Sequence, residues 1–291
     1  MSHKSIPAVF RIEPFVYKTV VLRGPGHAVQ FLGALTNDRP PEFAQSHVKA
    51  LCICPSIPLG LTIQLLTTCS GLESLALWIR IRPQSDTPDL INLLSPLPLA
   101  SLSLILHSIQ PTSYWNPPVL QNHAVFINLT HLDIVDHLVL WTSTLGIEHM
   151  PLLTHVAFRF WSRGSVNAAL SVILRESPKL QVLVLLTNSV VIHGAREYLE
   201  KQGVRDVRVV VLQHARDADE WELMERDSVT MWQRADIIVR WRRRNRGWCS
   251  VCGRVGAQRF ATAGPFDFPP GFSFGSPTPL LNLPRDADAC V

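Results

Sequence analysis

Short segments in which apolar and polar positions alternate recur along most of the chain. The clearest is residues 128–134, where Leu129, Leu132 and Ile134 form an L-x-x-L-x-I pattern. Successive side chains of a β-strand point to opposite faces of a sheet, so this pattern predicts a short strand with one buried face. The central apolar residues of this segment and seven related ones are Val20, Leu51, Leu75, Leu102, Leu132, Val156, Leu183 and Val209.

The spacing of these segments predicts the fold. Successive copies lie 24 to 31 residues apart, and a period in the twenties with L-x-x-L-x-L strands is typical of leucine-rich repeats. A single repeat cannot bury its own apolar face, whereas stacked repeats form a continuous sheet and core. An ordinary α/β domain with crossover helices is the alternative, and the nearly fixed step argues against it. We therefore predict an α/β leucine-rich-repeat solenoid of about seven to eight degenerate repeats over residues 16–214, with the parallel sheet on its concave side and helices on its convex side.

Apolar residues three or four positions apart predict helices between the strands. These helices are expected at 26–35, 58–68, 87–94, 136–149, 165–176 and 193–202. A longer stripe through Trp221, Trp232 and Val239, interrupted by Ser228, predicts one helix from Asp217 to Arg244. A solenoid exposes an apolar end that needs a cap, so residues 215–246 are interpreted as a capping helix with a basic end.

The two ends of the chain differ from the repeats. Residues 1–15 are expected to be a short lead-in, and the Pro- and Gly-rich residues 247–291 are expected to be a disordered tail.

The positive charge of the chain is concentrated in one segment. The net charge is +4, and Arg240, Arg242, Arg243, Arg244 and Arg246 supply more than this excess. The segment has the composition of a nuclear-import or nucleic-acid patch, but arginines near a helix C-terminus also complement the helix dipole and remain solvated. Because the rest of the chain is close to neutral, we favour the second interpretation and expect no nucleic-acid partner.

The location is expected to be intracellular, in the cytoplasm or nucleus. The N-terminal residues lack the apolar run of a signal peptide, and no apolar run is long enough to span a membrane. The six cysteines form no convincing disulfide framework, so reduced thiols are expected.

The chain resembles leucine-rich-repeat proteins related to fungal F-box proteins. The resemblance covers about residues 13–244 and is carried by the repeated strands, the entry segment 13–22 and the closing helix at 232–236. In complete members of that family an F-box precedes the repeats and docks onto a cullin-ligase adaptor. Too few residues precede position 13 for a three-helix F-box, so the resemblance implies ubiquitin-ligase components as partners only of a longer form that carries one.

A partner-binding surface is expected on the concave face. The alternation places Trp78, His131, Asp133, His155 and Arg159 on that face, where most other side chains are small or apolar. The charged and histidine side chains could bind an acidic or polar partner segment, and Trp78 could be an aromatic anchor. The alternatives are a solvated patch with local ion pairs and a tryptophan packed under a neighbouring loop. A metal site at the two histidines and Asp133 lacks a recognised ligand motif.

Two further motifs match the sequence patterns of chemical sites but lack the context that those sites need. Cys249 and Cys252 form a CxxC, but a zinc site needs four ligands and the sequence around them offers no complete set. Ser273 lies in a G-x-S-x-G match that is flanked by prolines instead of a strand and a helix. We therefore predict a non-enzymatic protein-interaction scaffold without cofactor or metal. The alternatives are a hydrolase using Ser273, a metal enzyme at His131 and His155, and a nucleic-acid binder through residues 240–246.

Overall fold

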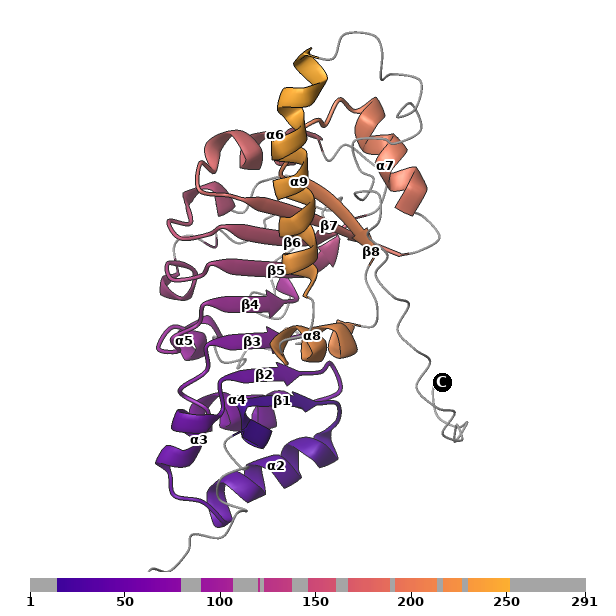
Figure 1. Cartoon of the computed structure of the whole chain (residues 1–291). Helices are drawn as coiled ribbons and strands as arrows, with labels where there is room; N and C mark the ends of the chain where they lie inside the picture. The colour runs from indigo at the N-terminus through magenta and orange to yellow at the C-terminus, as the bar shows by residue number, and fades with distance from the viewer. Residues whose placement is uncertain are drawn as a thin grey trace, which may run out of the picture.

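The computed structural model describes residues 15–79, 90–106, 120, 123–137, 146–160, 167–188, 192–213, 217–226 and 230–251. These residues form an eight-stranded parallel sheet in which the strands follow the order of the chain (Figure 1). The strands are β1 (Thr19–Leu22), β2 (Ala50–Ile53), β3 (Ser74–Leu77), β4 (Ser101–Leu104), β5 (His131–His137), β6 (His155–Arg159), β7 (Val182–Thr187) and β8 (Val209–Gln213).

The repeat pattern predicts the register of the sheet as well as its strands. Val20 lies opposite Leu51, Leu132 lies opposite Val156, and the intervening and following pairs continue the same row through to Val209. Every central residue chosen from the sequence therefore occupies one continuous row. The predicted α/β fold with a parallel sheet is confirmed, and the arrangement is consistent with a leucine-rich-repeat solenoid.

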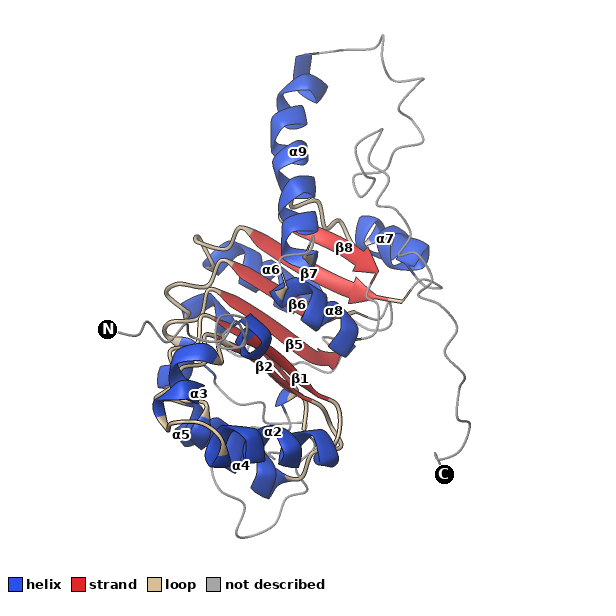
Figure 2. Cartoon of the chain, turned by 60° about the horizontal axis from the view of Figure 1, so that its bottom comes forward, coloured by secondary structure: helices blue, strands red, loops and turns tan. Residues whose placement is uncertain are grey.

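Helices and loops between the strands cover one face of the sheet and form the main core. They are α2 (Pro25–Asn37), α3 (Glu42–His47), α4 (Leu59–Thr68), α5 (Leu90–Leu94), η3 (Ala124–Phe126), η5 (Ile147–His149), α6 (Asn167–Glu176) and α7 (Ile192–Lys201). Figure 2 shows several of these helices gathered on one side of the strands. Leucines from successive strands meet leucines from these helices in one continuous apolar cluster, because one face of each strand carries them at alternate positions.

The turn after α4 shows how closely neighbouring repeats approach. A side chain at Gly71 would begin 1.8 Å from the carbonyl oxygen of Gln45. Only glycine therefore fits between the end of α4 and the end of α3.

The structure corrects the helix predicted at 136–149. Strand β5 continues to His137, residues 138–145 lie outside the described residues, and Ile147–His149 is a short 3-10 helix. The β5–β6 register shifts between Ile134 and His137, which indicates a bulge or similar irregularity at the end of β5. Helix α3 was not expected, because six residues are too few to show a helical period.

The C-terminal segment also differs from its prediction. Residues 217–244 do not form one helix at the end of the sheet. The described residues of this stretch form two helices, α8 (Asp217–Glu225) and α9 (Met231–Val251), and both lie on the face opposite the main core (Figure 1). Helix α9 begins with a capping box, in which Thr230 Oγ1 accepts from the Gln233 amide and Gln233 Oε1 accepts from the Thr230 amide.

Helix α9 runs to Val251, a few residues beyond the predicted start of the C-terminal tail at Gly247. Residues 252–291 lie outside the described residues, as do residues 1–14 of the predicted lead-in.

Candidate interaction surface on the inner face of the sheet

We call the face opposite the main core the inner face; it corresponds to the predicted concave face. Its side chains alternate with those of the main core along each strand. It comprises Ala50, Cys52, Cys54, Ser74, Ala76, Trp78, Ser101, Ser103, Ile105, His131, Asp133, Val135, His155, Ala157, Arg159, Val182, Val184, Leu186, Val210 and Leu212. Small side chains dominate over β2 to β4 and aliphatic ones over β7 and β8, so each end of the face can accept a different helix.

Helix α8 covers the β1–β3 end of the inner face. Its Trp221 is 2% exposed and packs in a cluster with Cys52, Ala76 and Trp78. Polar contacts also hold the helix: Arg23, just after β1, lies 2.9 Å from Asp219 Oδ1 and 3.1 Å from Glu222 Oε2, and the Ser74 hydroxyl donates to Glu225 Oε1 at 2.5 Å. The small inner-face residues of β2 and β3 leave the space that the Trp221 indole fills.

The cluster under α8 includes two thiols on one strand. Cys52 and Cys54 share the inner face, and the hydrogen bond between them, together with burial, raises the pKa of Cys52. The same hydrogen bond lowers the pKa of Cys54, and Arg23 acts in the same direction. Cys69 lies in the main core instead, where burial raises its pKa to about 12.

Helix α9 covers the β6–β8 end. Met231, Ala235, Ile238 and Val239 lie on one face of the helix and pack against the aliphatic rows of the sheet. The partners on the sheet are Ala157, Val182, Val184, Leu186, Val210 and Leu212. Figure 1 shows α9 crossing the strands and continuing past β8. The apolar positions of the C-terminal helices therefore mark an inner-face contact, not an end cap.

The two predicted histidines meet beneath α9. The rings of His131 and His155 are stacked, with centroids 4.3 Å apart and planes 13° from parallel. The indole of Trp232 meets both rings edge-on, with centroids 5.3 and 5.6 Å away. Asp236, one turn further along α9, places Oδ1 3.4 Å from Nε2 of His155. Trp232 and Asp236 thus enclose the pair on the side of the helix.

The neutral form of His155 satisfies both of its ring contacts. Thr154 Oγ1 lies 2.8 Å from His155 Nδ1 and 3.1 Å from the Thr130 carbonyl oxygen, which also accepts from the backbone amides of Thr154 and His155. In the tautomer that carries its hydrogen on Nε2, Nδ1 accepts from the Thr154 hydroxyl and Nε2 donates to Asp236 Oδ1.

Burial favours the neutral form of both rings. Burial is the main cause that lowers the pKa of His155, and Asp236 counteracts it. Burial and the neighbouring His155 lower the pKa of His131 to about 4. At neutral pH both rings are therefore neutral.

A chain of polar contacts crosses the middle of the inner face. The Trp78 indole donates to Ser103 Oγ at 2.9 Å, the Ser103 hydroxyl donates to Asp133 Oδ2 at 2.7 Å, and Arg159 Nη1 lies 3.4 Å from Asp133 Oδ1. Each of these four residues is buried, with no more than 7% of its surface exposed. Buried polar groups need partners to offset lost hydration, so the contacts give this cluster a structural role.

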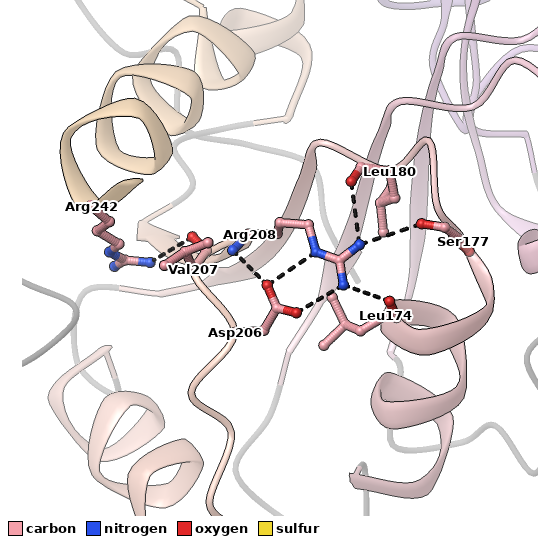
Figure 3. A network of polar contacts seen from close by, with 7 residues as sticks. All are labelled: Leu174, Ser177, Leu180, Asp206, Val207, Arg208 and Arg242. Atoms are coloured by element: carbon pink, nitrogen blue, oxygen red, sulfur yellow. Dashed lines mark hydrogen bonds and ion pairs between the residues drawn. The ribbon is translucent and has the colours of Figure 1, made fainter. Parts of the chain in front are cut away.

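The edge strand β8 is held by arginines from two directions (Figure 3). Arg242 of α9 is 8% exposed and donates to the carbonyl oxygens of Val209, at 2.6 Å, and Val207, at 3.4 Å. Arg208 pairs with Asp206 and donates to backbone carbonyls at the end of α6, those of Leu174, Ser177 and Leu180. Unpaired carbonyls at a sheet edge favour pairing with another chain, and Arg242 occupies two of them.

The predicted site residues are thus brought to one face, but they are not a free surface. Trp78, Asp133, His155 and Arg159 are buried and His131 is partly buried. The prediction missed the covering residues Trp221, Trp232 and Asp236. The only signal for them in the sequence was the aromatic stripe that we assigned to an end cap.

The basic segment also divides in the structure. Arg240, Arg243 and Arg244 are exposed, as a solvated helix face requires. Arg242 is instead buried and donates to the carbonyl oxygen of Val209. The side chain of Arg246 is outside the described part of the chain, as are the side chain of Cys249 and residues Cys252 and Ser273.

Two searches of the described residues bear on other kinds of site. Among them, no group of three or more His, Cys, Asp or Glu side chains is arranged to hold a metal ion. None of the helices in these ranges combines the length and the apolar character that crossing a membrane requires.

Comparison of the chain with protein-family models and with curated proteins found no match.

Proposed function

We propose that the chain is a leucine-rich-repeat solenoid that serves as a non-enzymatic protein-interaction scaffold. The observation that carries the proposal is the inner face itself. Parallel strands in chain order present a broad surface, and that surface accepts helical segments at both ends, α8 over β1–β3 and α9 over β6–β8. Extended surfaces of this kind are what repeat proteins use to bind partners.

The polar groups of the inner face support a binding role over a catalytic one. The carboxylate of Asp133 is engaged by Ser103 and Arg159, and His155 contacts Thr154 and Asp236. A catalytic base or nucleophile has to meet a substrate, whereas Asp133 and His155 are buried and contact side chains of the protein itself. Their arrangement favours a structural and recognition role.

A sharper form of the proposal is an F-box-like substrate receptor. It rests on the sequence resemblance and requires an F-box supplied by a longer form of the protein. In that form, ubiquitin-ligase components would bind the F-box and the repeats would bind the substrate.

Cross-linking followed by affinity capture from cells that express the protein tests the scaffold proposal. The tagged intact chain is cross-linked in the cells and captured, and cross-linked peptides are assigned by mass spectrometry. The proposal predicts a reproducible protein partner whose cross-links map to residues 15–213. Cullin-ligase components would support the receptor form, whereas repeated captures without a specific partner would contradict the scaffold function.

A further inference from the structure

We propose that the inner face over β5–β8 is a docking groove for an amphipathic helix, and that α9 is its occupant in cis. A partner helix with the chemistry of α9 would bind there in its place: an indole, a small residue at the third position after it, a carboxylate at the fourth and aliphatic residues at the sixth and seventh. In this chain these positions are Trp232, Ala235, Asp236, Ile238 and Val239. The proposal rests on the proposed scaffold function and specifies where and what the scaffold binds.

The first argument is that α9 is separable from the core of the fold. The main apolar cluster joins β1–β8 to the helices on the opposite face, and among the described residues it includes none from α8 or α9. The contacts of α9 form a second cluster on the inner face. Removing α9 would uncover that second cluster and leave the main core packed, so the sheet can persist without its occupant.

The second argument is that side chains of the groove contact specific side chains of a helix and can therefore recognise it. The stacked rings of His131 and His155 receive the edge of one indole, and His155 faces one carboxylate a turn later. Beyond them, Ala157 leaves room for a close approach of the helix, and Val184 and Val210 meet aliphatic side chains. Anchors one turn apart on an amphipathic helix are a recurrent way of binding in a groove.

Helix α8 provides a separate anchor for the C-terminal segment. Its ion pairs with Arg23 and the burial of Trp221 lie over β1–β3, away from the α9 groove. Release of α9 therefore does not require release of α8.

The test is binding of a fluorescent synthetic peptide, residues 230–245, to the purified full chain, measured by anisotropy. In the wild type, α9 competes for the groove. In the Trp232→Ala/Asp236→Ala chain, α9 loses two anchors while the groove is unchanged. Because apparent affinity scales with the fraction of open grooves, the double variant should bind the peptide roughly tenfold more tightly than wild type. Val239→Ala should give a smaller change in the same direction, and Arg243→Ala, on the exposed side of α9, should give none.

Two matched reagents locate the binding. Ala157→Arg, added to the double variant, fills the groove and should abolish binding, and a peptide with the Trp232 and Asp236 positions changed to alanine should bind roughly tenfold more weakly.

Three outcomes would overturn the inference. They are equal affinity for wild type and a folded double variant, equal binding after Ala157→Arg, and loss of the cooperative unfolding of the sheet in the variants, which would make α9 part of the core. None of these outcomes would exclude a partner that is cross-linked elsewhere on residues 15–213. The scaffold function can therefore stand when the groove proposal fails.

Discussion

The inner-face side chains have two kinds of polar partner. Some contacts lie within the sheet, as between Asp133 and Arg159, and others join the sheet to the C-terminal helices, as between His155 and Asp236. The first kind affects the stability of the sheet itself. The second affects the docking of α9.

Asp133→Ala should destabilise the whole fold. The substitution leaves the buried guanidinium of Arg159 without its partner on β5, and breaking a buried ion pair costs about 3 kcal/mol. Urea unfolding of the full chain measures the change. Arg159→Leu combined with Asp133→Ala should recover much of the loss, because neither charge of this pair is then left buried alone.

Glu73→Ala is the matched surface control for this prediction. Glu73 pairs with Lys49 through a side chain that is 60% exposed, and such pairs contribute less than about 1 kcal/mol. Equal destabilisation by Asp133→Ala and Glu73→Ala would show that burial of the inner-face pair has no energetic consequence.

The histidine pair predicts acid sensitivity. The folded state holds the pKa of His131 near 4 and lowers that of His155, so below pH 6.5 the unfolded chain binds more protons than the folded chain. Stability from these rings is therefore fully present above pH 6.5 and is lost as the pH falls toward 4. For His131 the loss is about 3 kcal/mol at about 1.4 kcal/mol per pKa unit.

Urea unfolding between pH 7.5 and 4.5 tests this sign. His131→Gln should flatten the pH dependence, while His149→Gln should leave it unchanged because the His149 side chain is 62% exposed. A wild-type protein that became more stable on acidification would show that pairing of His155 with Asp236 outweighs burial.

At the scale of elements, the sequence predicts one face of the sheet much better than the other. The repeat period fixes the strands and their register, because each leucine row can be buried only by stacking in chain order. The helices that follow most strands were found from their own local periods. The five inner-face residues were placed correctly for the same reason, since strand alternation is local.

The cover of the inner face could not be derived in the same way. The stripe through Trp221 and Trp232 shows that the C-terminal helices bury one side, but it does not say against what. An end cap and an inner-face contact have the same pattern, and only the long-range fit decides between them. The buried position of Arg242 was missed because its carbonyl partners lie on a distant strand.

Arg242 should hold α9 at the edge of the sheet. Its hydrogen bonds to the carbonyl oxygens of Val207 and Val209 involve a charged donor, a type of bond that contributes about 1.5–3 kcal/mol. Arg242→Ala should therefore speed tryptic cleavage within α9 by roughly tenfold or more, since 1.4 kcal/mol changes an opening equilibrium tenfold. Arg243→Ala, on the exposed side, should leave cleavage at Arg244 at the wild-type rate, and similar rates for both variants would contradict the edge contact.

Trp221 should control access to the thiols under α8. Trp221→Ala removes the indole that packs with Cys52 and Cys54, and loss of a buried tryptophan costs about 3–5 kcal/mol. Alkylation followed by peptide mass spectrometry should show Cys54 modified first, because its lowered pKa favours the thiolate. Cys69 in the main core serves as the internal control, and simultaneous modification of all three would indicate global unfolding instead of release of α8.

At the scale of the whole molecule, the chain has one continuous repeat core and two smaller contacts on the inner face. The core holds the sheet to its outer helices, and the C-terminal helices occupy the surface that a scaffold of this kind would offer to partners. The proposed groove depends on α9 being bound to the sheet yet separable from it, whereas the scaffold function does not.

Native-state hydrogen exchange of the intact chain, followed by mass spectrometry across sub-denaturing urea, tests that separability most directly. The structure predicts that amides of α9 exchange through an opening of lower free energy than those of β3–β7, which exchange only on global unfolding. Trp232→Ala should lower the free energy of opening of α9 and leave the free energy of global unfolding, measured at β3–β7, unchanged. Exchange of α9 and the strands at one common free energy, in both the wild type and the variant, would show that α9 is an integral part of the core and would contradict the account.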